Sequence, residues 1–109
     1  MDAGAGTGQV GVELHKFGFT TIDALDISPG MLNEAKKKNV YKKFICAALG
    51  GQQIPEIETG EYDVFICVGV FAIAHVPTVA LIEIMRMVRP VRSSKEIRFE
   101  INFNFHTAE

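Results

Sequence analysis

Hydrophobic positions along the chain alternate between the spacing of helices and that of strands. Apolar side chains recur three or four residues apart in 7–17 and 77–88, which predicts two helices, and Gly18 is placed to end the first of them. Ser28 as N-cap followed by Pro29 predicts another helix over 29–38. Strands are predicted at 21–26, 44–48 and 62–70, the last buried on both faces. Strands that alternate with helices are typical of an α/β fold with a parallel sheet.

The C-terminal segment has a different pattern. After Pro90, large apolar residues alternate strictly with polar ones, which predicts a further strand over 97–105. We expect its phenylalanines to belong to the core of the sheet rather than to form a substrate cage: these are Phe99, Phe103 and Phe105.

Composition narrows the classes of protein that fit. A chain of 109 residues with 48% apolar content is expected to form one domain. A net charge of −2 argues against a nucleic-acid-binding surface, and the longest apolar run, at 64–74, is too short to cross a membrane. The acidic, glycine-rich N-terminus does not resemble a signal peptide. With Cys46 and Cys67 expected as buried thiols, the sequence predicts a soluble, cytoplasmic protein without a metal site.

A glycine-rich stretch near the N-terminus is the most informative motif. In Asp2-Ala-Gly4-Ala-Gly6-Thr-Gly8 the alternate glycines allow the backbone to approach a ligand closely, and the helix that follows favours a polar or anionic group at its N-terminus. Asp26, at the end of the next predicted strand, suits the hydroxyls of a ribose. The pattern predicts a site for a nucleoside cofactor. Two structural alternatives stay open, a plain turn for the glycines and a strand-end turn for Asp26.

The motif also admits a second class of cofactor. Gly6-Thr-Gly8-Gln-Val-Gly11 matches the dinucleotide-binding pattern, with an acid at about the position that a nicotinamide cofactor needs. An NAD-binding Rossmann domain is therefore an alternative interpretation.

Two segments together resemble a known family. Asp2-x-Gly4-x-Gly6-x-Gly8 resembles the first motif of class I S-adenosylmethionine-dependent methyltransferases, and the stretch Leu25-Asp26-Ile27-Ser28-Pro29-Gly30-Met31-Leu32 resembles the second. With Asn39-Val40-Tyr41-Lys42 and Glu61-Tyr62-Asp63-Val64, the likeness extends to the methyltransferase-like group named for the Williams–Beuren syndrome region and covers 1–90. It implies a Rossmann-like three-layer sandwich and a methyltransferase that acts on a small-molecule or protein acceptor.

The resemblance also implies roles for particular residues. The three glycines would hold the amino-acid part of S-adenosylmethionine, with Asp2 nearby. Asp26 would bind the ribose, Ile27 would pack on the adenine, and Leu49 would add apolar packing. Family members often carry an acid after the third strand, where this chain has Ala48, and this departure weakens the expected adenine contact.

His75 is the candidate catalytic residue. It follows the strand predicted at 62–70, and a neutral imidazole can take a proton from a substrate nitrogen or oxygen. The alternative is a histidine at the start of a helix, packed beside Pro77.

Both ends of the chain depart from the family. The family has an apolar strand before the glycine loop, at the centre of its sheet, and further strands after an Arg/Lys-Pro turn, whereas this chain begins at Met1 and has a divergent tail over 91–109. We therefore expect 1–109 to be a single, partial methyltransferase domain. Unpaired backbone groups would cost about 1–3 kcal/mol each. The alternative is a non-catalytic fragment. Such a fragment would either fail to fold or bind a partner, or a second copy of itself, through exposed sheet edges.

Overall fold

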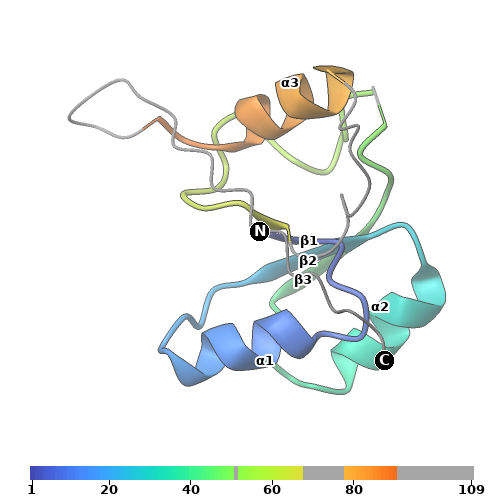
Figure 1. The fold of residues 1–109 in the computed structure, drawn as a ribbon, viewed down its shortest axis with the longest axis vertical. Coiled ribbons are helices and arrows are strands. Elements are labelled where there is room, and N and C mark those ends of the chain that lie inside the picture. The colour runs from blue at the N-terminus through green and yellow to red at the C-terminus, as the bar shows by residue number, and fades with distance from the viewer. Residues whose placement is uncertain (51, 68–77, 91–109) are drawn as a thin grey trace, which may run out of the picture.

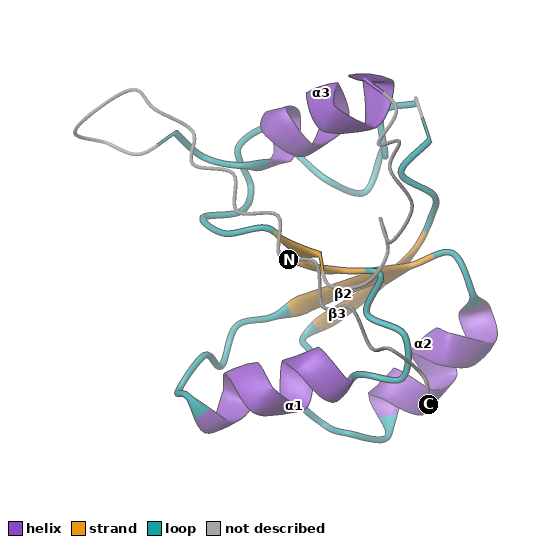
Figure 2. Cartoon of the chain, in the orientation of Figure 1, coloured by secondary structure: helices purple, strands orange, loops and turns teal. Residues whose placement is uncertain are grey.

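A parallel sheet with helices on both faces forms the fold (Figure 1). The computed structural model describes residues 1–50, 52–67 and 78–90. Its strands lie in the order β3-β2-β1-β4 and all pair in parallel. Their bounds are β1 (Asp2–Ala3), β2 (Asp23–Asp26), β3 (Lys43–Cys46) and β4 (Ile66–Cys67). Helices α1 (Gln9–Lys16) and α2 (Pro29–Lys36) cover one face and α3 (Thr78–Met87) lies on the other, which confirms the α/β class (Figure 2).

Strand β1 occupies the centre of the sheet, and this corrects the expectation that the strand before the glycine loop is missing. Asp2 is in register with Ala24 of β2 on one side and with Ile66 of β4 on the other. The pairing extends past both ends of the strand, because the N–H of Ile66 donates to the carbonyl of Met1 (2.8 Å) and the N–H of Gly4 to that of Leu25 (2.7 Å). The central strand is therefore short rather than absent, and it joins β2 to β4.

The described helices lie inside the ranges predicted for them, and the strands are shorter than expected. The segment predicted as a strand at 62–70 differs most, because only Ile66 and Cys67 are in the sheet, while Tyr62 forms an isolated parallel bridge with Val88. Val64 is 56% exposed and Ile66 is half-buried, so the described part of this segment is not buried on both faces as expected. Residues 68–70 and the tail at 91–109, with its predicted strand and phenylalanines, lie outside the described residues.

The expectation of two buried thiols is also corrected. Cys46 is exposed and Cys67 is half-buried. Cys46 ends β3, where its side chain donates weakly to the carbonyl of Ile27 (3.5 Å).

Two apolar clusters lie on opposite faces of the sheet because successive side chains of a strand point to opposite sides. Along β2, Ala24 belongs to the cluster under α2, and Leu25 belongs to the cluster that includes Met87 of α3. The first cluster contains Ala5, Ala24 and Leu32, with Tyr41 and Phe44 packed against it. The second contains Met1, Ala3, Leu25, Ile45, Ile54, Ile57 and Met87.

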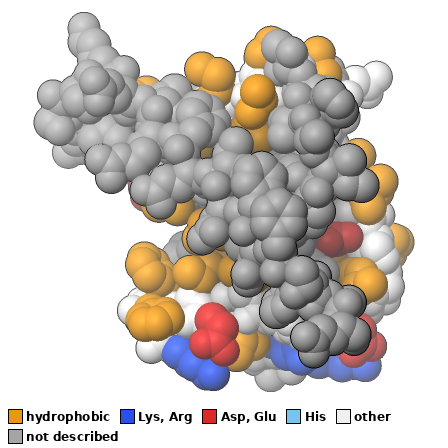
Figure 3. All heavy atoms as spheres, viewed as in Figure 1, with side chains coloured by type: hydrophobic (Ala, Val, Ile, Leu, Met, Phe, Trp, Pro, Cys, Tyr) orange, Lys and Arg blue, Asp and Glu red, His pale blue; other side chains and the backbone are white. Residues whose placement is uncertain are grey.

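The surface of the described residues carries charges of both signs. Figure 3 shows basic and acidic side chains intermingled at the end of the molecule formed by α1 and α2. In the part of the chain that the structure describes, none of the helices has the length and apolar character that crossing a membrane requires.

Candidate functional site

The turn between β1 and α1 requires glycine at three positions. The φ angles of Gly4, Gly6 and Gly8 are 66°, 56° and 95°, values that residues with a Cβ rarely adopt. A Cβ at Gly8 would also lie 3.2 Å from the ring of Tyr41 and 3.3 Å from the backbone of Ala35. The alternate glycines therefore shape a tight loop at the carboxyl end of the central strand, where ligands of open α/β sheets bind.

Asp26 ties this loop to the neighbouring strand. One carboxylate oxygen accepts from the N–H of Gly6 (2.9 Å) and the other from the N–H of Ser28 (2.8 Å). The bond from Ser28 is the strand-end turn expected as an alternative role, and the bond from Gly6 adds a contact across 20 residues. A carboxylate oxygen has two lone pairs, so both oxygens retain the capacity to accept from a second donor such as a sugar hydroxyl. The structural role and the binding role are therefore compatible.

Two exposed apolar side chains follow Asp26 closely along the chain. Ile27 is 71% exposed, and Met31, one helical turn further on in α2, is 45% exposed. Apolar side chains next to a few fixed polar groups are the usual composition of a small-molecule site. Ile27 is thus available for the packing role that the sequence predicted.

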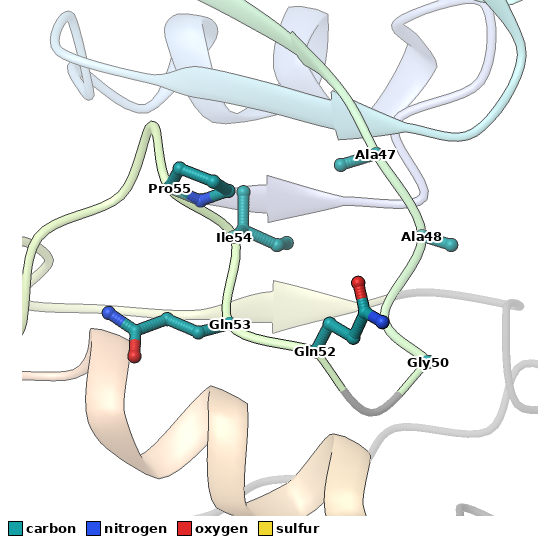
Figure 4. Close-up of a pocket in the computed structure, with 7 residues that line it drawn as sticks. All are labelled: Ala47, Ala48, Gly50, Gln52, Gln53, Ile54 and Pro55. Carbon is teal, nitrogen blue, oxygen red and sulfur yellow. The ribbon is translucent and has the colours of Figure 1, made fainter.

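A cavity of about 450 Å³ follows β3 (Figure 4). Its lining residues are Ala47, Ala48, Gly50, Gln52, Gln53, Ile54 and Pro55. Among the described residues that line it are two carboxamides and no carboxylate. The side chain of Gln52 points toward Ala48 and Gly50, whereas that of Gln53 points away (Figure 4).

Leu49 is not among the residues that line this cavity. Its side chain is half-buried and packs against the apolar cluster of Leu25 and Ile45.

Asp2 lies beneath the glycine loop and is 1% exposed. Its carboxylate accepts a hydrogen bond of 2.5 Å from the hydroxyl of Tyr41. Burial raises the pKa of Asp2 above its ordinary value, and the hydrogen bond from Tyr41 opposes that rise. Burial and the same hydrogen bond also raise the pKa of Tyr41. Asp2 is thus near the loop, as expected, but below it and shielded from solvent.

Sequence reasoning missed Tyr41 as a residue of this site. The signal available was an aromatic residue followed by two lysines, in Asn39-Val40-Tyr41-Lys42-Lys43, just after a predicted helix. That pattern gives no indication of the distant residues that Tyr41 contacts.

The structure brings most of the candidate residues to one edge of the sheet. The residues that lie there are Asp2, Gly4, Gly6, Gly8, Asp26 and Ile27. His75 lies outside the described residues, and its catalytic role stays a prediction. Among the described residues, no group of histidine, cysteine and carboxylate side chains is arranged to hold a metal ion.

Comparison with known sequences identifies relatives for most of the chain. A family model described as a methyltransferase domain matches residues 1–91. Human methyltransferase-like protein 27 is 34% identical over 84 residues, which make up 77% of this chain and 34% of that protein. The chain therefore spans about a third of the length of this relative.

Comparison with solved structures agrees. A putative S-adenosyl-L-methionine-dependent methyltransferase from Methanococcus maripaludis superimposes with a TM-score of 0.68 at 25% identity, covering 81% of this chain and 42% of the other. A SAM-dependent methyltransferase from Aquifex aeolicus has the same fold, with a TM-score of 0.65 at 22% identity over 82% of this chain and 50% of its own. These findings do not support the dinucleotide-binding alternative for Gly6 to Gly11.

Proposed function

Because the chain belongs to the methyltransferase domain family, we propose that it forms the cofactor-binding part of a class I S-adenosylmethionine-dependent methyltransferase. The observation that carries the proposal is the link between Asp26 and the glycine loop, in which Gly6 donates to one oxygen of the carboxylate. This bond holds the backbone of the glycine loop, which a ligand can approach closely, next to the Asp26 carboxylate, which can accept from sugar hydroxyls. A nucleoside attached to an amino acid needs both.

The chemistry of the residues at this edge supports the proposal. Gly4, Gly6 and Gly8 would hold its amino-acid part, since no Cβ stands between the ligand and their backbone. Asp26 would accept from the ribose hydroxyls while it keeps its two backbone donors. Ile27 would pack on the adenine. The segment after β3 would contact the adenine through neutral groups, because this chain has Ala48 where family members often have an acid.

S-adenosylmethionine, when bound, supplies an electrophilic methyl group. The protein's contribution is to hold the acceptor in line with that group, and such orientation can supply about 7–11 kcal/mol of the barrier. We propose a small molecule or a protein side chain as the acceptor. His75 is proposed to take the proton that the acceptor releases.

Isothermal titration of the chain with S-adenosylmethionine and S-adenosylhomocysteine tests the proposal, with NADH as the control ligand. We expect both sulfur compounds to bind and NADH not to bind. Substitution Asp26→Asn keeps the size of the side chain but removes its charge and one acceptor oxygen. We expect it to weaken binding by at least about tenfold, which corresponds to about 1.4 kcal/mol.

Asp23→Asn is the matched control. Asp23 begins the strand that Asp26 ends, and it accepts from Tyr62 (2.6 Å) rather than from the loop. We expect its affinity to stay within about twofold of the wild type, which is about 0.4 kcal/mol. Equal losses in the two variants would mean that Asp26 acts only through stability. Binding of NADH in preference to the sulfur compounds would refute the proposed cofactor.

A further inference from the structure

One phenolic hydroxyl touches both ends of the glycine loop. Tyr41 donates to the carboxylate of Asp2, which lies two residues before Gly4 (2.5 Å). The same oxygen lies against Gly11, three residues after Gly8, where an added Cβ would come within 2.3 Å of it. Tyr41 is 30 residues from Gly11 along the chain, so this bridge depends on the folded arrangement and not on local sequence.

Glycine at position 11 leaves the space that the bridge occupies. A Cβ on Gly11 would lie 2.3 Å from both the phenolic oxygen and the carbon that bears it, closer than any normal contact. A Cβ on Gly8 would lie 3.2 Å from another carbon of the ring. On another side the ring meets Phe44 edge to face, with 5.6 Å between ring centroids. The tyrosine therefore fits in a slot that only glycines leave open.

The tyrosine lies at a helix start that has no side-chain cap. Gly8 is the N-cap of α1 and has no side chain that could accept from the first turn. The first helical hydrogen bond runs from Val12 to the carbonyl of Gly8 (3.1 Å), so the amide of Gly11 precedes the regular ladder. The hydroxyl of Tyr41 lies beside Gly11, within this uncapped first turn.

We infer that Tyr41 is a positioning residue of the cofactor site, which holds the glycine loop in its binding conformation by bonding Asp2 at one end and packing against Gly8 and Gly11 at the other. The inference rests on the proposed function, because the loop is the part of the site that would enclose the amino acid of the cofactor. A loop that is already ordered loses less conformational entropy when the ligand binds. Tyr41 would therefore increase affinity without touching the ligand.

The chain offers a matched pair of substitutions. Tyr41→Phe and Tyr62→Phe each remove one hydroxyl that donates to an aspartate, at 2.5 Å and 2.6 Å respectively. Tyr62 contacts Asp23 and lies away from the loop. We expect Tyr41→Phe to weaken binding of S-adenosylhomocysteine by about fivefold to tenfold, and Tyr62→Phe to change it by less than about twofold. Equal effects of the two substitutions on affinity would overturn the inference.

The pH dependence of affinity gives a second readout that a general loss of stability would not reproduce. The groups that face Asp2 are the hydroxyl of Tyr41, the α-amino group of Met1 and the carboxylate of Asp26. Because the bond from Tyr41 lowers the pKa of Asp2, its removal raises that pKa and protonates Asp2 at a higher pH. We expect the affinity of Tyr41→Phe to fall more steeply on acidification than that of the wild type or of Tyr62→Phe.

A third measurement needs no cofactor. Amide hydrogen exchange by NMR should show faster exchange at Gly11 and Gly6 in Tyr41→Phe than in the wild type, with no change in Tyr62→Phe. Unchanged exchange at Gly11 would refute the inference, whereas failure of the wild type to bind either sulfur compound would refute the proposed function. If Tyr41→Phe does not fold, Asp2→Asn weakens the same bond from its other side and the same amides are compared.

Discussion

The two faces of the sheet each contain one hydrogen bond between a tyrosine and an aspartate, but they are built differently. On the face of α1 and α2, Tyr41 contacts Asp2 amid small residues and glycine backbone. On the face of α3, Tyr62 contacts Asp23 at the amino end of β2, beside an irregular segment that runs from 52 to 62. The first face packs regular elements against the sheet. The second must also accommodate a loop.

Polar side chains hold that loop. Glu83 of α3 accepts from the N–H of Ile54 (3.0 Å), and Arg86 donates to the carbonyls of Ile57 (2.8 Å) and Ile54 (3.3 Å). Arg86 and Glu83 also form an ion pair whose side chains are only 15% and 7% exposed. Backbone groups of an irregular segment lack the partners that a helix or sheet provides, so side chains must satisfy them. Helix α3 is therefore attached through hydrogen bonds as much as through apolar contact.

Substitution Arg86→Met would test that attachment most severely. It leaves Glu83, at 6% exposure, without its cation and two loop carbonyls without a donor. We expect the free energy of unfolding in urea to fall by about 3 kcal/mol, because breaking one side of a buried pair leaves an uncompensated charge. This is a large share of the roughly 5–15 kcal/mol that is typical of a domain.

The matched control is Lys16→Met on α1. Lys16 and Glu13 have the same spacing of three residues and lie 3.1 Å apart, but their side chains are 65% and 63% exposed. We expect a loss below about 0.5 kcal/mol. Similar losses in both variants would show that the network on α3 does not hold the loop, and the contrast between the faces would fail.

Local signals explain why most helices could be predicted from the sequence. Ser28 caps α2 by accepting from the N–H of Met31 (3.2 Å), with Pro29 at the first position, as its sequence indicated. Gly18 has φ 93° just after α1, as expected for a residue that ends a helix. Each of these features depends on residues within a few positions of one another. The glycine loop and Asp26 could also be predicted from local sequence. Their spacing along one strand–loop–helix unit is the pattern that indicated the site.

The remaining features depend on contacts between distant segments, which no local pattern reveals. Strand β1 has two residues and is defined by its neighbours β2 and β4 rather than by its own sequence. Contacts across 39 residues place Tyr41 beside Asp2, and the position of Leu49 in the core is likewise set by tertiary packing. The acceptor, the cytoplasmic location and association through sheet edges stay predictions.

Alanine substitution of two helical glycines tests how closely Tyr41 packs against α1. Alanine normally stabilises a helix relative to glycine by up to about 1 kcal/mol. Gly30 in α2 has open space, with its nearest atom, the hydroxyl oxygen of Ser28, 3.8 Å from an added Cβ. We expect Gly30→Ala to raise the free energy of unfolding by a few tenths of a kcal/mol or more.

Gly11→Ala should have the opposite effect although it is also in a helix. Its Cβ would meet the phenolic oxygen of Tyr41 at 2.3 Å, so the ring must move and the bridge to Asp2 must break. We expect a loss of about 1–3 kcal/mol, as for other overpacked sites, measured by urea unfolding. Stabilisation by Gly11→Ala would mean that Tyr41 does not lie against α1 in solution.

The smallest expected difference between the two faces is in how acid changes their contributions to stability. One carboxyl group on each face responds, and the two responses have opposite signs. Hydrogen bonding from Arg86 lowers the pKa of Glu83 from its ordinary value of 4.5. The stability that Glu83 contributes is therefore fully present above pH 4.5. It is lost as the pH falls through the lower pKa that Glu83 has in the folded state. Burial raises the pKa of Asp2 from 3.8, so its contribution is complete below that pH and is lost as the pH rises. The two carboxyl groups therefore act in opposite directions over the same range.

Urea unfolding at several values between about pH 5 and pH 3 separates the two contributions. Glu83→Gln should lose less stability than the wild type on acidification, because the group that responds to acid on the face of α3 is gone. Asp2→Asn should lose more, because it lacks the buried carboxyl whose protonation offsets the loss. Glu61, whose pKa is lowered by a hydrogen bond from the backbone of Glu58, is present in all three chains and does not affect the comparison. Parallel curves for the two variants would mean that neither carboxyl is held as the structure describes, since each pKa shift follows from the contacts that distinguish one face from the other.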